Sequence, residues 1–478
     1  MCDLCSLRRR DFLKGAFGTV LGAATGGGLF SALPALAQTS PAPAVAPPRE
    51  FVLRGGHVLT MNAAGIDLPA GDVHIRDGII VAVGENISAA GAEIIDAADM
   101  IVMPGFVETH WHLWNTALRG AIRADDPKAG YFPLTLRLGP KCTPQDAYAS
   151  VRLGAAEGLM SGITTLHNWA HNIRTPEHAN AELQALKDMG IRSRFSYGWG
   201  QDLPLTSPMN LADLTRVQKE WGGSPNMLRL GAALRSPTPG SRGAVPIDVL
   251  KVEVDGLRKL GLPMTMHTGV KGLVDVLASI GALGPDMMLV HAQGLSEGER
   301  RAVAYTKLVY SMSPVIELSF SAVRSGTIQY EELKTLEVPL GLSIDSSGAS
   351  ASADFFNVMR ALMWSDWQRS GAPLRLPPRR IVQLATIDGA RLMGLDKITG
   401  SLEPGKRADI ITVRKLDLNM APVQDPYYSL VFSGQPSNID MVVADGRIVR
   451  RNGAAVGIDV NKIVSEAIAS ANGILSRG

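Results

Sequence analysis

The chain has 478 residues, of which 46% are hydrophobic and 19% charged, so it is long enough for several ordinary domains or for one large barrel with an appendage. A formal charge of only +2 excludes the strong basic field that attracts nucleic acid or an anionic membrane. Only Cys142 lies beyond the first 37 residues, which excludes a fold that depends on internal disulfides.

Residues 1–37 have the pattern of an export signal. Arg8 to Arg10 precede Asp11 to Lys14, a Gly/Ala-rich stretch follows, and Ala35 to Ala37 is a small-residue cleavage pattern. This resembles a twin-arginine signal peptide, so we expect a periplasmic or secreted protein with no stable membrane anchor once the signal is cleaved. An uncleaved membrane-anchoring helix is the alternative, which Gly26 to Gly28 disfavour. Without this segment, which holds four basic and two acidic residues, the formal charge is zero.

A linker and two β segments are expected around a central region. Residues 38–50 are rich in Pro and Ala, which is typical of a linker. Residues 51–104 have strand patterns around Asp77-Gly78, and residues 399–478 repeat this pattern around Asp445-Gly446 before a C-terminal helix. Similar hairpins at both ends of the chain predict one small β-sandwich formed by the N- and C-terminal segments.

Residues 105–398 alternate between apolar strand runs and helical patterns. A helix is expected from Pro144 to about Met160, because Thr143 can cap it and Pro144 suits its first position. Another is expected over residues 177–189, and it ends at Gly190. The alternation continues to about residue 398 and predicts an α/β fold, specifically a (β/α)8 TIM-like barrel.

Metal-ligand residues follow several of the predicted strands. His110 and His112 follow one apolar run, and three more stand after later runs: His267, His291 and Asp345. In a barrel of this kind the chemistry lies at the C-terminal ends of the strands. His-x-His on an extended segment directs both rings to one side, and neutral imidazoles with a carboxylate suit zinc or iron. The pattern therefore predicts a metal centre.

With these motifs the sequence resembles the amidohydrolase superfamily, in the branch of cytosine deaminase and triazine hydrolases. The resemblance rests on segments 104–112, 162–165, 290–292, 343–345, 385–391 and 400–409, the last of which is a structural return to the sandwich. It implies that His110, His112, His267 and Asp345 hold one divalent metal ion, for which zinc is favoured and iron is the alternative. It also implies that His291 contacts the bound water or a substrate carbonyl. Binuclear members have a carboxylated Lys after the fourth strand, where this chain has Arg235-Ser236-Pro237.

The expected chemistry is hydrolysis by a metal-bound hydroxide, with Asp345 and His291 as catalytic residues that accept and relay its proton. Deaminases of this branch have Glu three residues after the fifth-strand His, whereas this chain has Val270. The favoured function is therefore cleavage of a non-peptide C–N bond, of amide, lactam, carbamate or urea type, in a small cyclic or aromatic compound. The alternatives are an aminohydrolase or dehalogenating hydrolase of a heteroaromatic ring, and a non-catalytic periplasmic binding protein.

Further residues are expected near the pocket. Glu317 follows the seventh strand and is a candidate catalytic carboxylate in place of the missing acid, with a loop salt bridge as the alternative. Four residues at strand ends are candidates for substrate binding, with packing at the top of the barrel as the alternative for the aromatic ones: Trp111, Trp114, His171 and Trp199. We expect a small-molecule substrate and no nucleic-acid partner. A homo-oligomer is compatible with the fold, and neither substrate identity nor oligomeric state follows from the sequence.

Overall fold

The structure is a computed structural model that describes residues 50–123, 125–237, 244–268, 272–291, 295–321, 330, 333, 336–350, 352–370 and 376–478. All of them belong to one compact unit, Val45–Gly478. The predicted signal and all but the last residue of the predicted linker lie outside the described residues, and so does Val270.

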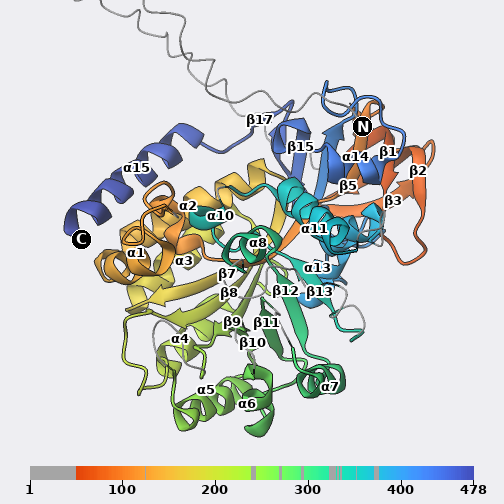
Figure 1. Cartoon of the computed structure of the whole chain (residues 1–478). Coiled ribbons are helices and arrows are strands. Elements are labelled where there is room, and N and C mark those ends of the chain that lie inside the picture. The colour runs from red at the N-terminus through yellow and green to blue at the C-terminus, as the bar shows by residue number, and fades with distance from the viewer. Residues whose placement is uncertain are drawn as a thin grey trace, which may run out of the picture. The chain divides into compact units, whose positions relative to one another are not determined.

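The centre of this unit is a parallel sheet of eight strands that curves into a nearly closed barrel (Figure 1). The sheet contains β6 (Phe106–Trp111), β7 (Ile163–Ile173), β8 (Arg192–Trp199), β9 (Leu228–Ala233), β10 (Met264–His267), β11 (Met287–Val290), β12 (Val309–Met312) and β13 (Leu340–Leu342), each paired with the next. The first and last strands meet through a parallel bridge between Trp111 and Asp345. The predicted (β/α)8 barrel is confirmed.

Helices alternate with these strands and cover the outside of the barrel (Figure 1). They include α2 (Pro144–Met160), α3 (Pro176–Met189), α4 (Leu211–Trp221), α5 (Ile247–Lys259), α6 (Leu273–Ser279), α7 (Glu297–Thr306), α8 (Pro314–Ser321), α10 (Ser347–Ser350), α11 (Phe355–Ser370), α12 (Pro378–Leu384) and α13 (Ile387–Leu392). Thr143 caps α2 as expected, because its side chain accepts a hydrogen bond from the Asp146 backbone N–H and the Asp146 carboxylate bonds back in return. Gly190 ends α3 in the left-handed conformation.

The two ends of the chain combine in one mixed sheet of nine strands. The first five are β1 (Glu50–Leu59), β2 (Asp67–Arg76), β3 (Ile79–Gly84), β4 (Glu93–Asp96) and β5 (Met100–Pro104). The last four are β14 (Ile410–Arg414), β15 (Ile439–Ala444), β16 (Arg447–Arg451) and β17 (Ala454–Ala455). Central β5 pairs with both β1 and β14, and side chains from both ends share one core. The expected small β domain built from both ends of the chain is therefore present.

Both predicted hairpin turns join strands of this sheet. Asp77-Gly78 links β2 to β3 and Asp445-Gly446 links β15 to β16, and all four residues have positive φ, as a type I′ turn requires. A Cβ on Gly446 would lie 2.1 Å from the Gly78 Cα, so the two turns touch and glycine is needed where they meet.

A buried ion pair connects this sheet to the barrel. Arg192 of β8 bonds to Asp409 at 2.9 Å and to Asp445 at 2.7 Å, and the Arg192 and Asp409 side chains are each 1% exposed. The segment that the sequence marked as a structural return to the sandwich thus supplies the acidic partner. The chain ends in α15 (Val460–Arg477), which packs on α2. Within the described part of the chain, no helix is long and apolar enough to cross a membrane.

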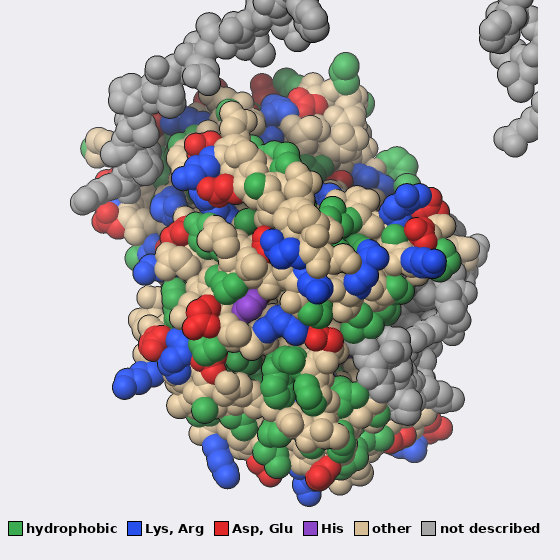
Figure 2. Space-filling view, turned by 90° about the vertical axis from the view of Figure 1, so that its left-hand side faces the viewer, with side chains coloured by type: hydrophobic (Ala, Val, Ile, Leu, Met, Phe, Trp, Pro, Cys, Tyr) green, Lys and Arg blue, Asp and Glu red, His purple; other side chains and the backbone are tan. Residues whose placement is uncertain are grey.

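Charged side chains of both signs lie on the molecular surface. On the face shown in Figure 2, Lys and Arg side chains are interspersed with Asp and Glu side chains, and hydrophobic side chains lie between them.

Candidate metal centre

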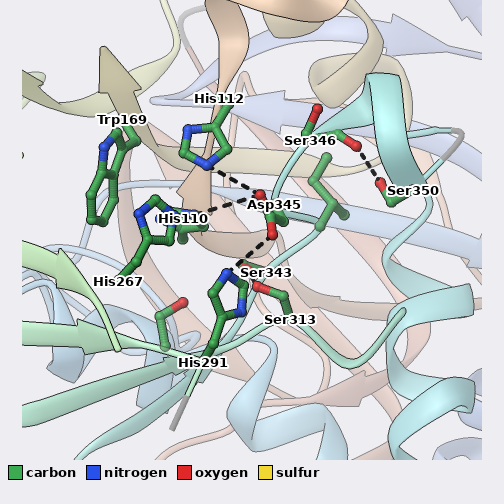
Figure 3. A network of polar contacts seen from close by, with 12 residues as sticks. His110, His112, Trp169, His267, His291, Ser313, Ser343, Asp345, Ser346 and Ser350 are labelled. Atoms are coloured by element: carbon green, nitrogen blue, oxygen red, sulfur yellow. Dashed lines mark hydrogen bonds and ion pairs between the residues drawn. The ribbon is translucent and has the colours of Figure 1, made fainter. Parts of the chain in front are cut away.

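Five ligand-type side chains meet at the C-terminal ends of the barrel strands (Figure 3). His110 lies on β6 and His112 follows that strand, His267 ends β10, and His291 directly follows β11. Asp345 follows β13, where its backbone N–H donates to His110 O and its carbonyl accepts from the His112 N–H. The closure of the barrel therefore fixes the His-x-His pair against Asp345.

The ligand atoms converge on one point. His110 Nε2 lies 3.2 Å from His267 Nε2 and 3.6 Å from Asp345 Oδ1, and His112 Nε2 lies 3.2 Å from the same oxygen. The ligand atoms of His110, His112 and Asp345 all lie within 4.8 Å of one another, and so do those of His110, His267 and His291. Because both groups contain His110, they are parts of a single cluster.

Burial and the contacts among these side chains together set the charge state of the cluster. Burial, followed by the nearby imidazoles, lowers the pKa of His110 to about 3, and the same causes hold the pKa of His267 well below its ordinary value. Burial alone would raise the pKa of Asp345, but hydrogen bonds from His110, His112 and His291 hold it well below its ordinary value. Neutral imidazoles and an ionised carboxylate are the donors that a divalent transition metal prefers, so the residues present fit such an ion.

His291 differs from the other imidazoles because carboxylates face both of its nitrogens. Its Nε2 lies 3.2 Å from Asp345 Oδ2 and its Nδ1 lies 3.3 Å from Glu317 Oε1. Burial would lower the pKa of His291, but the bonds to the two carboxylates outweigh burial and raise it to about 10. His291 and Asp345 also have φ values of 61° and 67°, a conformation that costs energy for residues other than glycine and is concentrated at functional sites.

Comparison with protein families identifies the family. A family model described as the amidohydrolase family matches residues 101–200 and 263–449, more than half of the chain. The chain belongs to the amidohydrolase family. Together with the buried ligand cluster, this makes it a metal-dependent hydrolase that acts on carbon–nitrogen bonds.

Similar proteins cover nearly the whole amidohydrolase chain. A 5'-deoxyadenosine deaminase of Methanosarcina acetivorans is 25% identical, over 90% of this chain and 99% of the relative. A 5-methylthioadenosine/S-adenosylhomocysteine deaminase of Desulfitobacterium hafniense is 27% identical, over 87% of this chain and 97% of the relative.

Solved structures share the fold. The zinc-bound adenosine deaminase from Xanthomonas campestris has a TM-score of 0.78 at 20% identity, over 90% of this chain and 99% of that chain. A mutant of the atrazine chlorohydrolase from Arthrobacter aurescens, complexed with zinc and atraton, has a TM-score of 0.76 at 19% identity, over 88% of this chain and 100% of that chain.

Glu317 reaches the cluster of this amidohydrolase through His291. It lies on α8, is 4% exposed, and accepts a 2.8 Å hydrogen bond from the Ser313 backbone N–H with the oxygen that faces His291. The sequence placed Glu317 near the pocket as a candidate catalytic carboxylate. In the structure its buried carboxylate lies behind His291 and holds that ring through Nδ1.

The prediction that Trp111 binds substrate is wrong. Trp111 is fully buried and its indole lies against Gly154 and Gly158 of α2, on the outer side of the barrel. The side-chain period of two explains this position, because it places Trp111 opposite to the flanking histidine rings. The alternation of side chains that directs His110 and His112 toward the cluster therefore directs Trp111 away from it.

Of the other three substrate candidates, His171 lies nearest the cluster. Its ring centroid is 4.3 Å from that of His112, and the Trp114 indole N–H donates to it at 3.2 Å. Trp114 is packed in a small apolar core with Leu134 of α1 (Tyr131–Leu138). This packing holds its indole N–H in position to donate to His171. Trp199 packs at the edge of the main core under the Arg235 guanidinium, 5.2 Å from its ring centroid.

Two further residues lie near the cluster. Trp169 lies beside His267 and His110, with its ring centroid 4.2 Å and 4.6 Å from theirs, and forms one wall of the site (Figure 3). It lies on β7, two residues before His171, so both side chains point to the same face of that strand. The fully buried carboxylate of Glu108 accepts hydrogen bonds from the backbone N–H groups of His110 and Ile344, and so joins the two ligand-bearing segments.

Two further histidines have structural positions. His167 bonds to Thr109 O at 2.8 Å and to Ser196 Oγ at 2.7 Å inside the barrel. His178 lies in the first turn of α3 and bonds to Cys142 O. The described strand β9 carries no Lys, and Lys251 is an exposed residue of α5.

Proposed function

We propose that this amidohydrolase uses one divalent ion, with zinc favoured, to hydrolyse a non-peptide C–N bond in a small cyclic or aromatic compound. The observation that carries the proposal is the convergence of His110, His112, His267 and Asp345 at the strand ends. The absence of Lys from β9 supports a single ion, because this strand would supply the bridging ligand of a second one. The zinc in the two solved structures of similar fold supports the choice of metal.

The ion would supply Lewis-acid activation of water and of the bond under attack. The chain's own residues then handle the proton. Asp345 Oδ2 can accept a proton from the attacking water, because its carboxylate is ionised. His291 Nε2 lies 3.2 Å from that oxygen and is protonated at neutral pH, so it can donate a proton to the departing nitrogen and take the proton from Asp345 in return. Glu317 keeps the His291 ring in that orientation through Nδ1. Trp169 and His171 would contact the substrate beside the histidines.

Hydrolysis of an amide-type bond is the favoured reaction. Displacement of an amine from an aromatic ring needs an acid for the ring nitrogen, and the sequence has Val270 where similar deaminases carry Glu. Glu317 is committed to His291 and Ser313, so it does not replace that acid directly. An aminohydrolase is the second candidate, because the deaminase relatives match about nine-tenths of the chain.

Ammonia release separates the two candidates. The zinc-loaded enzyme would be incubated with matched panels of aminated purines, pyrimidines and triazines and of cyclic amides, carbamates and ureas, and both ammonia and ring-opened products would be measured. Ring-opened or amide-cleaved products without ammonia from aminated rings support the first proposal. Ammonia from an aminated heterocycle overturns it in favour of the second, and release of chloride from a chlorinated triazine would assign a dehalogenating activity instead.

Metal analysis tests the single-ion proposal. Purified protein, dialysed against a metal-free buffer, is expected to retain about one equivalent of zinc or iron per chain, because the four proposed ligands form a single set. Retention of two equivalents contradicts a mononuclear site. Reconstitution of the apo-protein with zinc and with ferrous ion, one at a time, shows which metal restores hydrolysis.

We also propose that the protein is exported by the twin-arginine route and works outside the cytoplasm. The sequence from Arg9 to Lys14 supports this proposal, and a metalloenzyme loaded before transport suits a route that carries folded proteins. Fractionation of cells that express the full chain is expected to find the shortened protein in the periplasm. The double variant Arg9→Lys, Arg10→Lys should remain in the cytoplasm at full length; its continued export would refute the proposal.

A further inference from the structure

Two arginines lie near the end of the barrel at which the strands begin, called the closed end below. The metal centre lies at the other end, where the strands end. Arg194 and Arg229 are partners in the parallel register of β8 and β9, near the N-terminal ends of these strands. Arg194 shares a strand face with Ser196, whose hydroxyl bonds to His167 inside the barrel. The two guanidinium groups therefore belong to the barrel interior, below His167.

Both side chains reach the same short segment. Arg194 Nη2 donates to the Met393 carbonyl at 2.7 Å, and Arg229 Nη1 lies 3.4 Å from the place that a Cβ on Gly394 would occupy. Met393 and Gly394 follow α13, whose apolar side chains pack with Val107 and Met288 of the barrel. Two cations thus meet at two consecutive residues beneath the barrel.

Among the described residues, neither cation has an acidic partner. No carboxylate of the described residues lies within ion-pair distance of Arg194 or Arg229, and Nε of both is buried without a hydrogen-bond partner. Arg194 is only 7% exposed, and burial, followed by the charge of Arg229, lowers its pKa to about 10. Arg194 is therefore still charged at neutral pH, and two like charges without a counterion are costly in such a place.

We propose that these two arginines bind one small tetrahedral oxyanion of the phosphate or sulfate class at the closed end of the barrel. Guanidinium groups present paired N–H donors that match such an anion, and the Nε groups of both arginines lack a hydrogen-bond acceptor. Gly394 is exposed and Arg229 is partly exposed, so solvent reaches the segment where the two side chains meet. The site is remote from the metal ligands and independent of the proposed function.

Phosphate binding to the metal-loaded enzyme tests this inference. Equilibrium dialysis with radiolabelled inorganic phosphate would compare the wild type, Arg229→Gln and the control Arg301→Gln, which removes a cation from a 71% exposed side chain on α7. The wild type and the control should bind one phosphate with equal affinity, and Arg229→Gln should bind it at least about tenfold more weakly. Unchanged binding by Arg229→Gln, as expected if phosphate occupies only the metal centre, overturns the proposal. Absence of binding at roughly 10 mM phosphate overturns it as well.

Thermal unfolding supplies a second, independent readout. In chloride, Arg229→Gln should unfold at or above the temperature of the wild type, because it removes repulsion from Arg194. In saturating phosphate at equal ionic strength, the wild type should gain on the order of 3 °C and become the more stable of the two. A purely structural role for Arg229 predicts a variant that is less stable in both salts, which would overturn the proposal. Sulfate in place of phosphate tests whether the site takes both members of the proposed class.

Discussion

Glu182 of α3 is a buried carboxyl group whose ionisation should control how stability depends on pH. It is 1% exposed, and its Oε2 accepts a 2.7 Å hydrogen bond from the Asn168 side-chain amide of β7. Its Oε1 and the Asn168 Oδ1 are both buried without a partner. Burial raises the pKa of Glu182 to about 8, so the folded protein favours the neutral acid.

The sign and size of the effect follow from this pKa. In the unfolded chain Glu182 ionises near its ordinary value of 4.5, whereas in the folded protein it ionises near 8. Between pH 4.5 and pH 8 the folded state binds one more proton than the unfolded state. The free energy of unfolding therefore falls as pH rises through this range, and above pH 8 it no longer changes because of Glu182. A shift of this size corresponds to about 5 kcal/mol, or about 5 °C in Tm for a folded unit of this length.

Glu182→Gln should remove this pH dependence, because the amide is permanently neutral and can both donate to and accept from Asn168. Differential scanning calorimetry at pH 5 and pH 8.5 would compare it with the wild type and with Glu220→Gln, a control on α4 whose side chain is 50% exposed. We expect nearly equal Tm values at pH 5, and at pH 8.5 a Glu182→Gln variant that is more stable by about 5 °C. An equal difference between the two proteins at both pH values would refute the reasoning, since Glu182 would then ionise in the fold as it does in water.

Four further substitutions test the site and its support. His110→Ala should lose metal and hydrolytic activity together, which metal analysis and a single-substrate assay will show; retained metal would remove His110 from the ligand set. Glu108→Gln should weaken metal retention by about 10- to 100-fold in competition with a chelator, because it disturbs the backbone of His110 and Ile344. Glu317→Gln should change the pH profile of kcat because His291 loses a carboxylate partner, and an unaltered profile would contradict that role. Arg192→Met should lower the free energy of unfolding by about 3–5 kcal/mol, because it leaves Asp409 buried and unpaired; a smaller change in chemical denaturation would show that the pair contributes little.

The sequence by itself determined the class of fold and indicated which ligand-type residues would come together. Strand runs alternate with capped helices in the pattern of a parallel α/β domain, and a (β/α)8 barrel fits the length of this region. Asp77-Gly78 and Asp445-Gly446 are local signals for hairpin turns. Histidines at strand ends could be expected to converge, because the C-terminal ends of parallel strands meet on one face of a barrel. These are local signals, set by backbone geometry and side-chain period.

Only the tertiary structure decided which side chains from distant segments face one another. Glu317 is 26 residues from His291 in sequence, and its pairing with Nδ1 depends on how α8 packs after β12. The position of Trp169 against His267 depends on the curvature that brings β7 near β10 across the barrel. The same holds for Arg194 and Arg229, which have no acidic partner among the described residues, because the surroundings of a side chain come from many segments of the chain. Periodicity fixes the direction of a side chain from its own strand, whereas its partners depend on packing between strands and helices far apart in the sequence.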